Sequence, residues 1–210
     1  MKTRQINLTI EEKSQLARLN DLYQVGQTPL MLSIERSVCG CDYGATSWTT
    51  RAEVEQMISL LQLGQHAVLL DLGSGAGWPA LYLSKLTGCD VALVDLPIEG
   101  LHIARKRALQ DNDPGSCWVA VADAAELPFA AASFDALCHS DLLCCLERKS
   151  NVLSDCRRVL RPGGRMVFSV ISVVPDLTPA DHQRAVDLSL IHISEPTRPR
   201  LLSYAVFCLK

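Results

Sequence analysis

Short, continuously apolar runs recur through the middle of the chain. They occupy residues 67–70, 91–94, 118–121, 134–138 and 165–170, the last of them after a turn at 161–164. Runs of this length are typical of parallel strands that are buried on both faces. Between the runs, helical periodicity covers residues 78–87, 97–110 and 147–159. Strand and helix in alternation predict an α/β fold with a doubly wound, mostly parallel sheet.

Residues 1–62 have the pattern of three helices. A capping box at residues 9–12 starts the first helix, which Gly26 should end. Pro29 opens a second, short helix, because proline at the first helical position loses no hydrogen bond. A second capping box at residues 50–53 starts the third helix, which should run through Leu61. We expect these helices to form an N-terminal cap on the sheet domain.

Composition and charge narrow the classes of partner. A chain of 210 residues with 48% hydrophobic and 20% charged residues is long enough for one well-buried domain. A net charge of -3 provides no positive field for nucleic acid or an anionic membrane. The sequence has no run of about eighteen consecutive apolar residues, so it gives no sign of a membrane span. The nine cysteines lie mostly in apolar runs, which favours reduced thiols and a cytoplasmic location, and the Cys39–Cys41 spacing does not fit a metal site.

A glycine-rich loop, DLGSGAG at residues 71–77, follows the first predicted strand. Glycines there allow a sharp turn and a close approach to a ligand, and free amides at a following helix face that ligand. A tight turn without a ligand is the alternative. The dinucleotide fingerprint needs glycine or alanine at position 78, which is tryptophan here. The loop therefore favours a nucleoside ligand without a pyrophosphate bridge over NAD.

Acidic residues end the next two predicted strands. Asp95 follows the second strand, where a carboxylate can accept hydrogen bonds from both hydroxyls of a ribose. Asp123 follows the third, where a carboxylate can accept from an adenine amine while the Ala124 amide donates to a ring nitrogen. Taken singly, each acid has the less favoured alternative of a solvated strand-end residue. Three acids in the right order make that alternative a poor joint explanation.

Five motifs in order resemble those of the class I S-adenosylmethionine-dependent methyltransferases. They are residues 71–77, 95–96, 123–129, 133–135 and 158–164, within a stretch from 66 to 172. The resemblance implies a Rossmann-like methyltransferase core that binds S-adenosyl-L-methionine and methylates a small-molecule acceptor. It places Gly73, Ser74 and Gly75 at the methionine part and Asp71 near its amino group. It places Asp95 at the ribose, Leu96 over the adenine, Asp123 and Ala124 at the adenine edge, and His139 beside the cofactor.

The catalytic residues are less well determined. The sulfonium cofactor is already a strong methyl donor, so a base is needed only if the acceptor loses a proton. His139 and Asp141, after the fourth strand, are the candidates; cofactor positioning and a helix cap are their alternative roles. Tyr43 and Trp48 are candidates for a lid over the acceptor, or for core packing.

Two other functions stay open. A non-catalytic module could bind the same cofactor. An NAD-linked oxidoreductase is disfavoured by Trp78 and by the absence of a Tyr-x-x-x-Lys pair. The charge run at residues 105–107 is expected to form a solvated helix face.

The last part of the chain has a different character. Residues 173–187 suggest a loop and a short helix capped at Thr178-Pro179, the start of an acceptor-side region. Residues 188–198 and 202–209 resemble the in-frame translation of the two ends of a sequencing adapter. We therefore interpret residues 188–210 as a non-native tail, and expect the gene to continue differently after Asp187.

We expect this tail to lower solubility. Its apolar segment, residues 201–209, has the composition of a strand and could occupy the open sheet edge beside residues 165–172 without a selected register. The chain should therefore aggregate more than a version with the natural sequence after Asp187. Expression of both, with soluble yield and methyl transfer measured, checks this. Equal solubility and activity would assign the tail a functional part in the protein.

Overall fold

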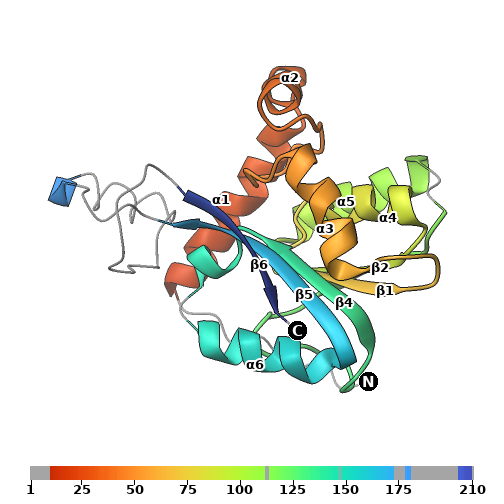
Figure 1. Cartoon of the computed structure of the whole chain (residues 1–210). Helices are drawn as coiled ribbons and strands as arrows, with labels where there is room; N and C mark the ends of the chain where they lie inside the picture. Colours follow the sequence, from red (N-terminus) through yellow and green to blue (C-terminus); the bar gives the residue numbers. More distant parts are fainter. Residues whose placement is uncertain (1–9, 112–113, 147, 173–177, 181–202, 210) are drawn as a thin grey trace.

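The computed structural model describes residues 10–111, 114–146, 148–172, 178–180 and 203–209 (Figure 1). Its centre is one sheet with the strand order β3-β2-β1-β4-β5-β6. The strands are β1 Val68–Leu72, β2 Asp90–Asp95, β3 Cys117–Val121, β4 Phe134–Ser140, β5 Leu160–Ser172 and β6 Ser203–Leu209. The first five pair in parallel, in the order 3-2-1-4-5. The predicted doubly wound α/β fold is confirmed.

The helices follow the predicted pattern closely. They are α1 Ile10–Gly26, α2 Pro29–Val38, α3 Arg51–Leu61, α4 Ala80–Thr87, α5 Ile98–Asp111 and α6 Lys149–Val159, with a short 3-10 turn η1 at Leu143–Cys145. Both hydrogen bonds of the capping box at Thr50 and Glu53 are present. Thr9, which was expected to cap the first helix, lies outside the described residues. No helix among the described residues is long and apolar enough to cross a membrane.

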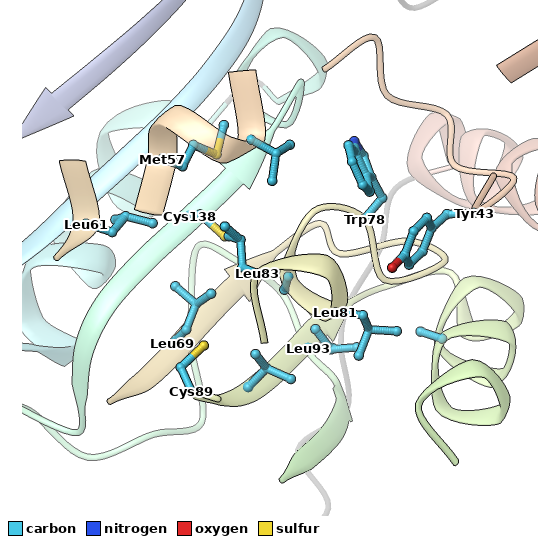
Figure 2. Packing of buried hydrophobic residues seen from close by; sticks show 14 of the residues in the cluster. Tyr43, Met57, Leu61, Leu69, Trp78, Leu81, Leu83, Cys89, Leu93 and Cys138 are labelled. Atoms are coloured by element: carbon cyan, nitrogen blue, oxygen red, sulfur yellow. The ribbon is translucent and has the colours of Figure 1, made fainter. Parts of the chain in front are cut away.

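Alternating side chains along the strands divide the interior into two clusters. Leu69, Leu93 and Cys138 point to the face covered by α3 and α4, where Figure 2 shows Met57 and Leu81 packing toward them. The intervening residues of the strands point to the opposite face, which α6 covers with Val152, Cys156 and Val159. This division is the period of two that a strand imposes on its side chains. Because β1, β2 and β4 pair in parallel, their carboxyl ends lie at one edge of the sheet, between these two apolar layers.

Strand β5 is longer than predicted, because the expected turn at residues 161–164 lies inside it. Leu160 pairs with Phe134 and Arg165 pairs with Ala136, so the register shifts between these pairs. The extra residues form a bulge, and Gly163 has a φ of 81° there, a conformation that glycine adopts without strain. The turn residues were identified correctly, but they interrupt the strand rather than precede it.

The edge of the sheet beside β5 is occupied by β6, which pairs with it in the antiparallel direction over Met166–Ser172. The apolar segment of the C-terminal region thus forms a strand at the edge where we expected it. The interpretation of residues 188–210 as a non-native tail stays a prediction. Only Pro179 and Ala180 of the helix expected after Thr178 lie within the described residues, and both are helical.

The N-terminal helices attach to the sheet domain at different places. Helix α1 packs against α5, and α3 packs against α4 and β5. The charge run on α5 differs from its prediction: Arg107 is partly buried, its guanidinium lies 3.8 Å from the centre of the Tyr43 ring, and it pairs with Asp42 at 2.7 Å. Because the guanidinium carries an aromatic contact and an ion pair at once, Arg107 fastens the loop before α3 to α5.

Candidate cofactor site

The glycine loop between β1 and α4 needs its glycines. Gly73, Gly75 and Gly77 have φ values of 63°, 47° and 95°, which side-chain-bearing residues rarely adopt. A Cβ on Gly75 would lie 2.5 Å from the Tyr23 hydroxyl, and one on Gly73 would lie 2.8 Å from Leu142. Any other residue at these positions would strain the backbone, and Tyr23 and Leu142 leave no room for a side chain on Gly75 or Gly73.

The loop is tied to the carboxyl end of β2. The amides of Gly73 and Ser74 donate to the Val94 carbonyl at 2.8 and 3.2 Å. The Gly75 amide donates to Asp95 Oδ2 at 2.8 Å, and Asp95 Oδ1 accepts from the Leu96 amide at 2.8 Å. Asp95 thus holds the glycine loop against β2 and still has lone pairs for further donors. Burial raises the pKa of Asp95 to about 6, although both amides act in the other direction.

Two buried polar atoms beside the loop have no hydrogen-bond partner in the described part of the chain. They are Asp71 Oδ2 and Ser74 Oγ. Asp71 is 1% exposed, and burial raises its pKa well above the ordinary value. The charge of Asp95 acts in the same direction, whereas hydrogen bonds with the Cys138 thiol and the Ala80 amide lower the pKa. A buried carboxylate without a cation is costly, and a positively charged ligand group would remove that cost. These two acceptor oxygens therefore fit a ligand with a positively charged amine at this loop.

Asp123 lies two residues beyond β3 and is engaged by the protein itself. Its Oδ1 accepts from the Ala125 amide at 2.8 Å, and its Oδ2 pairs with Arg148. Arg148 is half exposed, so this ion pair contributes little to stability and can be exchanged for another donor. The roles expected of Asp123, Ala124 and Leu96 at an adenine stay predictions.

The sequence analysis placed His139 after the fourth strand, but the residue lies inside β4. It is fully buried and stacks on Phe168, with 4.7 Å between the ring centres. Burial lowers the pKa of His139 to about 3, and neither ring nitrogen has a partner among the described residues. A neutral imidazole enclosed in this way is poorly placed to accept a proton from an acceptor, and the expected position of His139 beside the cofactor stays a prediction.

Asp141 follows β4 directly and is held in an unusual conformation. Its φ is 56°, and its Oδ2 accepts from the Ser47 hydroxyl at 3.0 Å and the Trp48 amide at 2.9 Å. Its Oδ1 is buried without a partner in the described chain, and burial raises its pKa. Asp141 is therefore not a helix cap. Its carboxylate joins the loop before α3 to the carboxyl edge of the sheet.

The two aromatic candidates separate in the structure. Tyr43 is 5% exposed, and its ring lies beside that of Trp78 (Figure 2). The two ring centres are 5.1 Å apart. It belongs to the core, which was the alternative reading of this residue. Trp48 is 59% exposed and lies next to Asp141 through its amide. The Trp78 indole fills the core and donates to the Thr49 carbonyl at 2.9 Å, which explains why position 78 is not small.

One residue of the site was missed from the sequence. Tyr23 is the single buried residue among the described side chains of α1, at 4% exposed, and its ring lies against Gly75. Burial, with the charge of Asp95, raises its pKa, whereas a hydrogen bond with Thr46 acts in the other direction. The sequence marks Tyr23 only as an apolar position of a helix, because no local pattern tells which surface a helix covers.

A glycine loop after the first strand of a doubly wound sheet, with carboxylates at the ends of β1 and β2, defines a nucleoside-cofactor site. Residues 70–168 match the family model described as a methyltransferase domain. The methyltransferase GfsG of Streptomyces halstedii is 32% identical over 119 residues, which are 57% of this chain and 43% of the relative. The sarcosine/dimethylglycine N-methyltransferase of Halorhodospira halochloris is 33% identical over 57% of this chain and 43% of the relative.

Solved structures share the fold. Phosphoethanolamine N-methyltransferase 2 of Haemonchus contortus, in complex with S-adenosyl-L-methionine, superposes with a TM-score of 0.69 at 20% identity, over 84% of this chain and 41% of the other. The [4+2]-cyclase SpnF superposes with a TM-score of 0.61 at 23% identity, over 75% of this chain and 59% of the other. The chain thus spans less than half the length of the two curated relatives above. Residues 70–168 belong to the class I S-adenosylmethionine-dependent methyltransferases, and S-adenosyl-L-methionine is their cofactor.

We expect Gly75→Val to abolish cofactor binding without unfolding the domain. A branched Cβ would meet the Tyr23 hydroxyl and would require a φ that valine does not adopt. Calorimetry with S-adenosylhomocysteine and circular dichroism measure the two effects separately. Gly64→Val is the matched control, because a Cβ at Gly64 meets nothing within 4 Å. Normal binding by the Gly75 variant would reduce the loop to a tight turn.

We expect cofactor binding to weaken as Asp95 is protonated. The ionised carboxylate is the stronger acceptor, so binding is favoured above its pKa of about 6 and lost as the pH falls through that value. Between pH 7 and pH 5 the Kd for S-adenosylhomocysteine should rise about tenfold. Asp95→Asn should remove this difference, and Asp95→Ala should cost about 1.5–3 kcal/mol of binding at pH 7. A wild-type Kd that is the same at both pH values would contradict this role.

Proposed function

We propose that this chain transfers the methyl group of S-adenosyl-L-methionine to a small-molecule acceptor. The observation that carries the proposal is the pair of unpartnered buried atoms at the glycine loop, Asp71 Oδ2 and Ser74 Oγ. They suit the charged amino-acid end of the cofactor, and Asp95 at the neighbouring strand suits its ribose. When bound, the cofactor supplies a methyl group on a sulfonium centre, so the protein has to bind, orient and exclude water.

On the acceptor side we propose Asp141 and Trp48. The backbone strain at Asp141 is retained by two hydrogen bonds from the loop before α3, and its second oxygen has no partner in the described chain. Strained residues with an unused buried acceptor are typical of functional sites. The pKa of Asp141 is raised by burial, which moves this carboxyl toward the range useful for a base. Trp48 offers an exposed aromatic surface beside it.

One relative supports an acceptor of small size. Its name states N-methylation of sarcosine and dimethylglycine, and it matches 57% of this chain. The name of another relative, a malonyl-[acyl-carrier protein] O-methyltransferase, states an acceptor that is attached to a carrier protein. The SpnF cyclase supports a second candidate, because it has this fold and a name that states another reaction. A module that binds the cofactor without transferring its methyl group is therefore the alternative that the experiment must separate.

Binding and turnover distinguish these functions. We expect the chain to bind S-adenosylmethionine and S-adenosylhomocysteine more tightly than NAD in calorimetry. We also expect it to methylate some members of a panel of amines, carboxylic acids and phenols, detected by mass spectrometry. Cofactor binding without turnover by a chain carrying the natural downstream sequence would favour the non-catalytic module. Tighter binding of NAD would contradict the proposal as a whole.

We expect Asp141→Asn to lower kcat about 100-fold or more if Asp141 is the base, with the Kd for S-adenosylhomocysteine unchanged within twofold. Asparagine tolerates a positive φ, so the backbone at position 141 should be retained. Asp21→Asn on the exposed face of α1 is the control for loss of one negative charge. Unchanged kcat with a raised KM would assign Asp141 to acceptor binding instead, and no change in either would remove it from the site.

A further inference from the structure

Two adjacent cysteines lie at the same edge of the sheet as the cofactor site. Cys144 and Cys145 end the 3-10 turn η1, and their sulfurs are 3.9 Å apart. Both thiols are directed to the Asp141 carbonyl, at 2.9 Å for Cys144 and 3.5 Å for Cys145. Side chains of neighbouring residues in an extended strand point to opposite faces, whereas this turn brings the two sulfurs onto one side.

The surroundings of Cys145 favour its thiolate. A hydrogen bond with Cys144 lowers the pKa of Cys145, and the positive charge of Arg18 on α1 acts in the same direction. Burial and the charges of Asp141 and Asp95 oppose this shift. Elsewhere burial dominates, and it raises the pKa of Cys89 and brings that of Cys156 to about 12. Thiolates are the reactive form, so the hydrogen bond with Cys144 favours attack by Cys145.

The pair adjoins the residues that surround the glycine loop. Asp95 and Tyr23 both interact electrostatically with Cys145. Leu142, the residue before η1, lies 2.8 Å from the place where Gly73 would carry a Cβ. A group attached to Cys145 would therefore reach the space between η1, α1 and the glycine loop.

The geometry disfavours a disulfide between the two sulfurs. Adjacent Cα atoms are about 3.8 Å apart across a trans peptide, whereas disulfides usually join Cα atoms about 4.4–6.8 Å apart. A direct S–S bond would be strained and easily reduced. One larger, soft atom placed between the sulfurs relieves that strain, because each sulfur then bonds to the inserted atom.

We propose that Cys144 and Cys145 form a dithiol site for trivalent arsenicals, and that occupation of this site excludes S-adenosyl-L-methionine. The first half stands on the sulfur geometry alone. The second half rests on the proposed cofactor site, because it requires the ligand to occupy the loop beside Cys145.

The reaction with an arsenoxide balances without an oxidant. Cys145 attacks arsenic first and Cys144 closes the ring, so that two As–S bonds form. The As–O bonds break, and the two thiol protons leave with the oxygen as water. The second bond is intramolecular, because the Cys144 sulfur already lies 3.9 Å from its partner, and it benefits from a high effective concentration. Cys144 is 1% exposed, so ring closure follows attachment at the more accessible Cys145.

Phenylarsine oxide and intact-mass spectrometry test the first half. The full chain should take up one phenylarsenic group that resists excess glutathione and is removed by 2,3-dimercaptopropanol. Fragmentation of the wild-type adduct should place it on Cys144 and Cys145, a result that needs no variant. Cys145→Ser and Cys144→Ala should each lose the glutathione-resistant adduct, while Cys156→Ser, a buried cysteine on α6, should retain it. An adduct on another pair, such as Cys39 and Cys41, would overturn the proposal.

Competition tests the second half. At S-adenosylhomocysteine tenfold above its Kd, labelling should slow about tenfold, and the arsenical adduct should abolish cofactor binding by reciprocal linkage. Unchanged labelling in the presence of bound cofactor would overturn the exclusion. If the chain binds no S-adenosylhomocysteine at all, the proposed function fails, and the adduct map still decides whether the dithiol site exists.

Discussion

The hydrogen bond from the Gly75 amide to Asp95 is the contact on which the rest of the site depends. It joins the loop after β1 to the end of β2, and the Val94 carbonyl strengthens the same connection by accepting from Gly73 and Ser74. Hydrogen bonds to a charged acceptor contribute about 1.5–3 kcal/mol each, enough to hold a loop of three glycines in a conformation that few other residues adopt. With the loop held there, Asp71 Oδ2 and Ser74 Oγ are buried without partners in the described chain, and the Tyr23 ring lies against Gly75.

The buried polar atoms without partners distinguish this edge from the rest of the interior. Most buried polar groups in proteins have a partner, and each exception costs free energy. Within the described chain the exceptions include atoms of Asp71, Ser74, His139 and Asp141, all close to the carboxyl ends of β1 and β4. The fold tolerates this cost because the two apolar clusters on either side of the sheet hold the strands in register. Cys144 and Cys145 lie at the same edge of the sheet, so the candidate cofactor site and the cysteine pair are neighbours.

Local patterns were reliable where a single physical rule decides the outcome. Apolar runs became the parallel strands, the capping box at Thr50 began α3, and the glycines at 73 and 75 adopted positive φ. The length of β5 was underestimated, since pairing with β4 on both sides of the bulge, rather than any residue preference, extends the strand back to Leu160. Arg107 was expected in solvent, and its contacts with Tyr43 and Asp42 depend on a loop 65 residues away.

The fold class, the glycine loop and the acidic residues at the strand ends can be read from the sequence, because strand period, glycine conformation and motif order are local properties. The groups from distant parts of the chain that meet at this edge cannot be read in the same way. Tyr23 comes from α1, and Ser47 and Trp48 come from the loop before α3. Cys145 on η1 interacts electrostatically with Asp95. These contacts depend on how the helices pack on the sheet. Packing depends on the shapes of all the contacting surfaces together, and no short stretch of sequence holds that information.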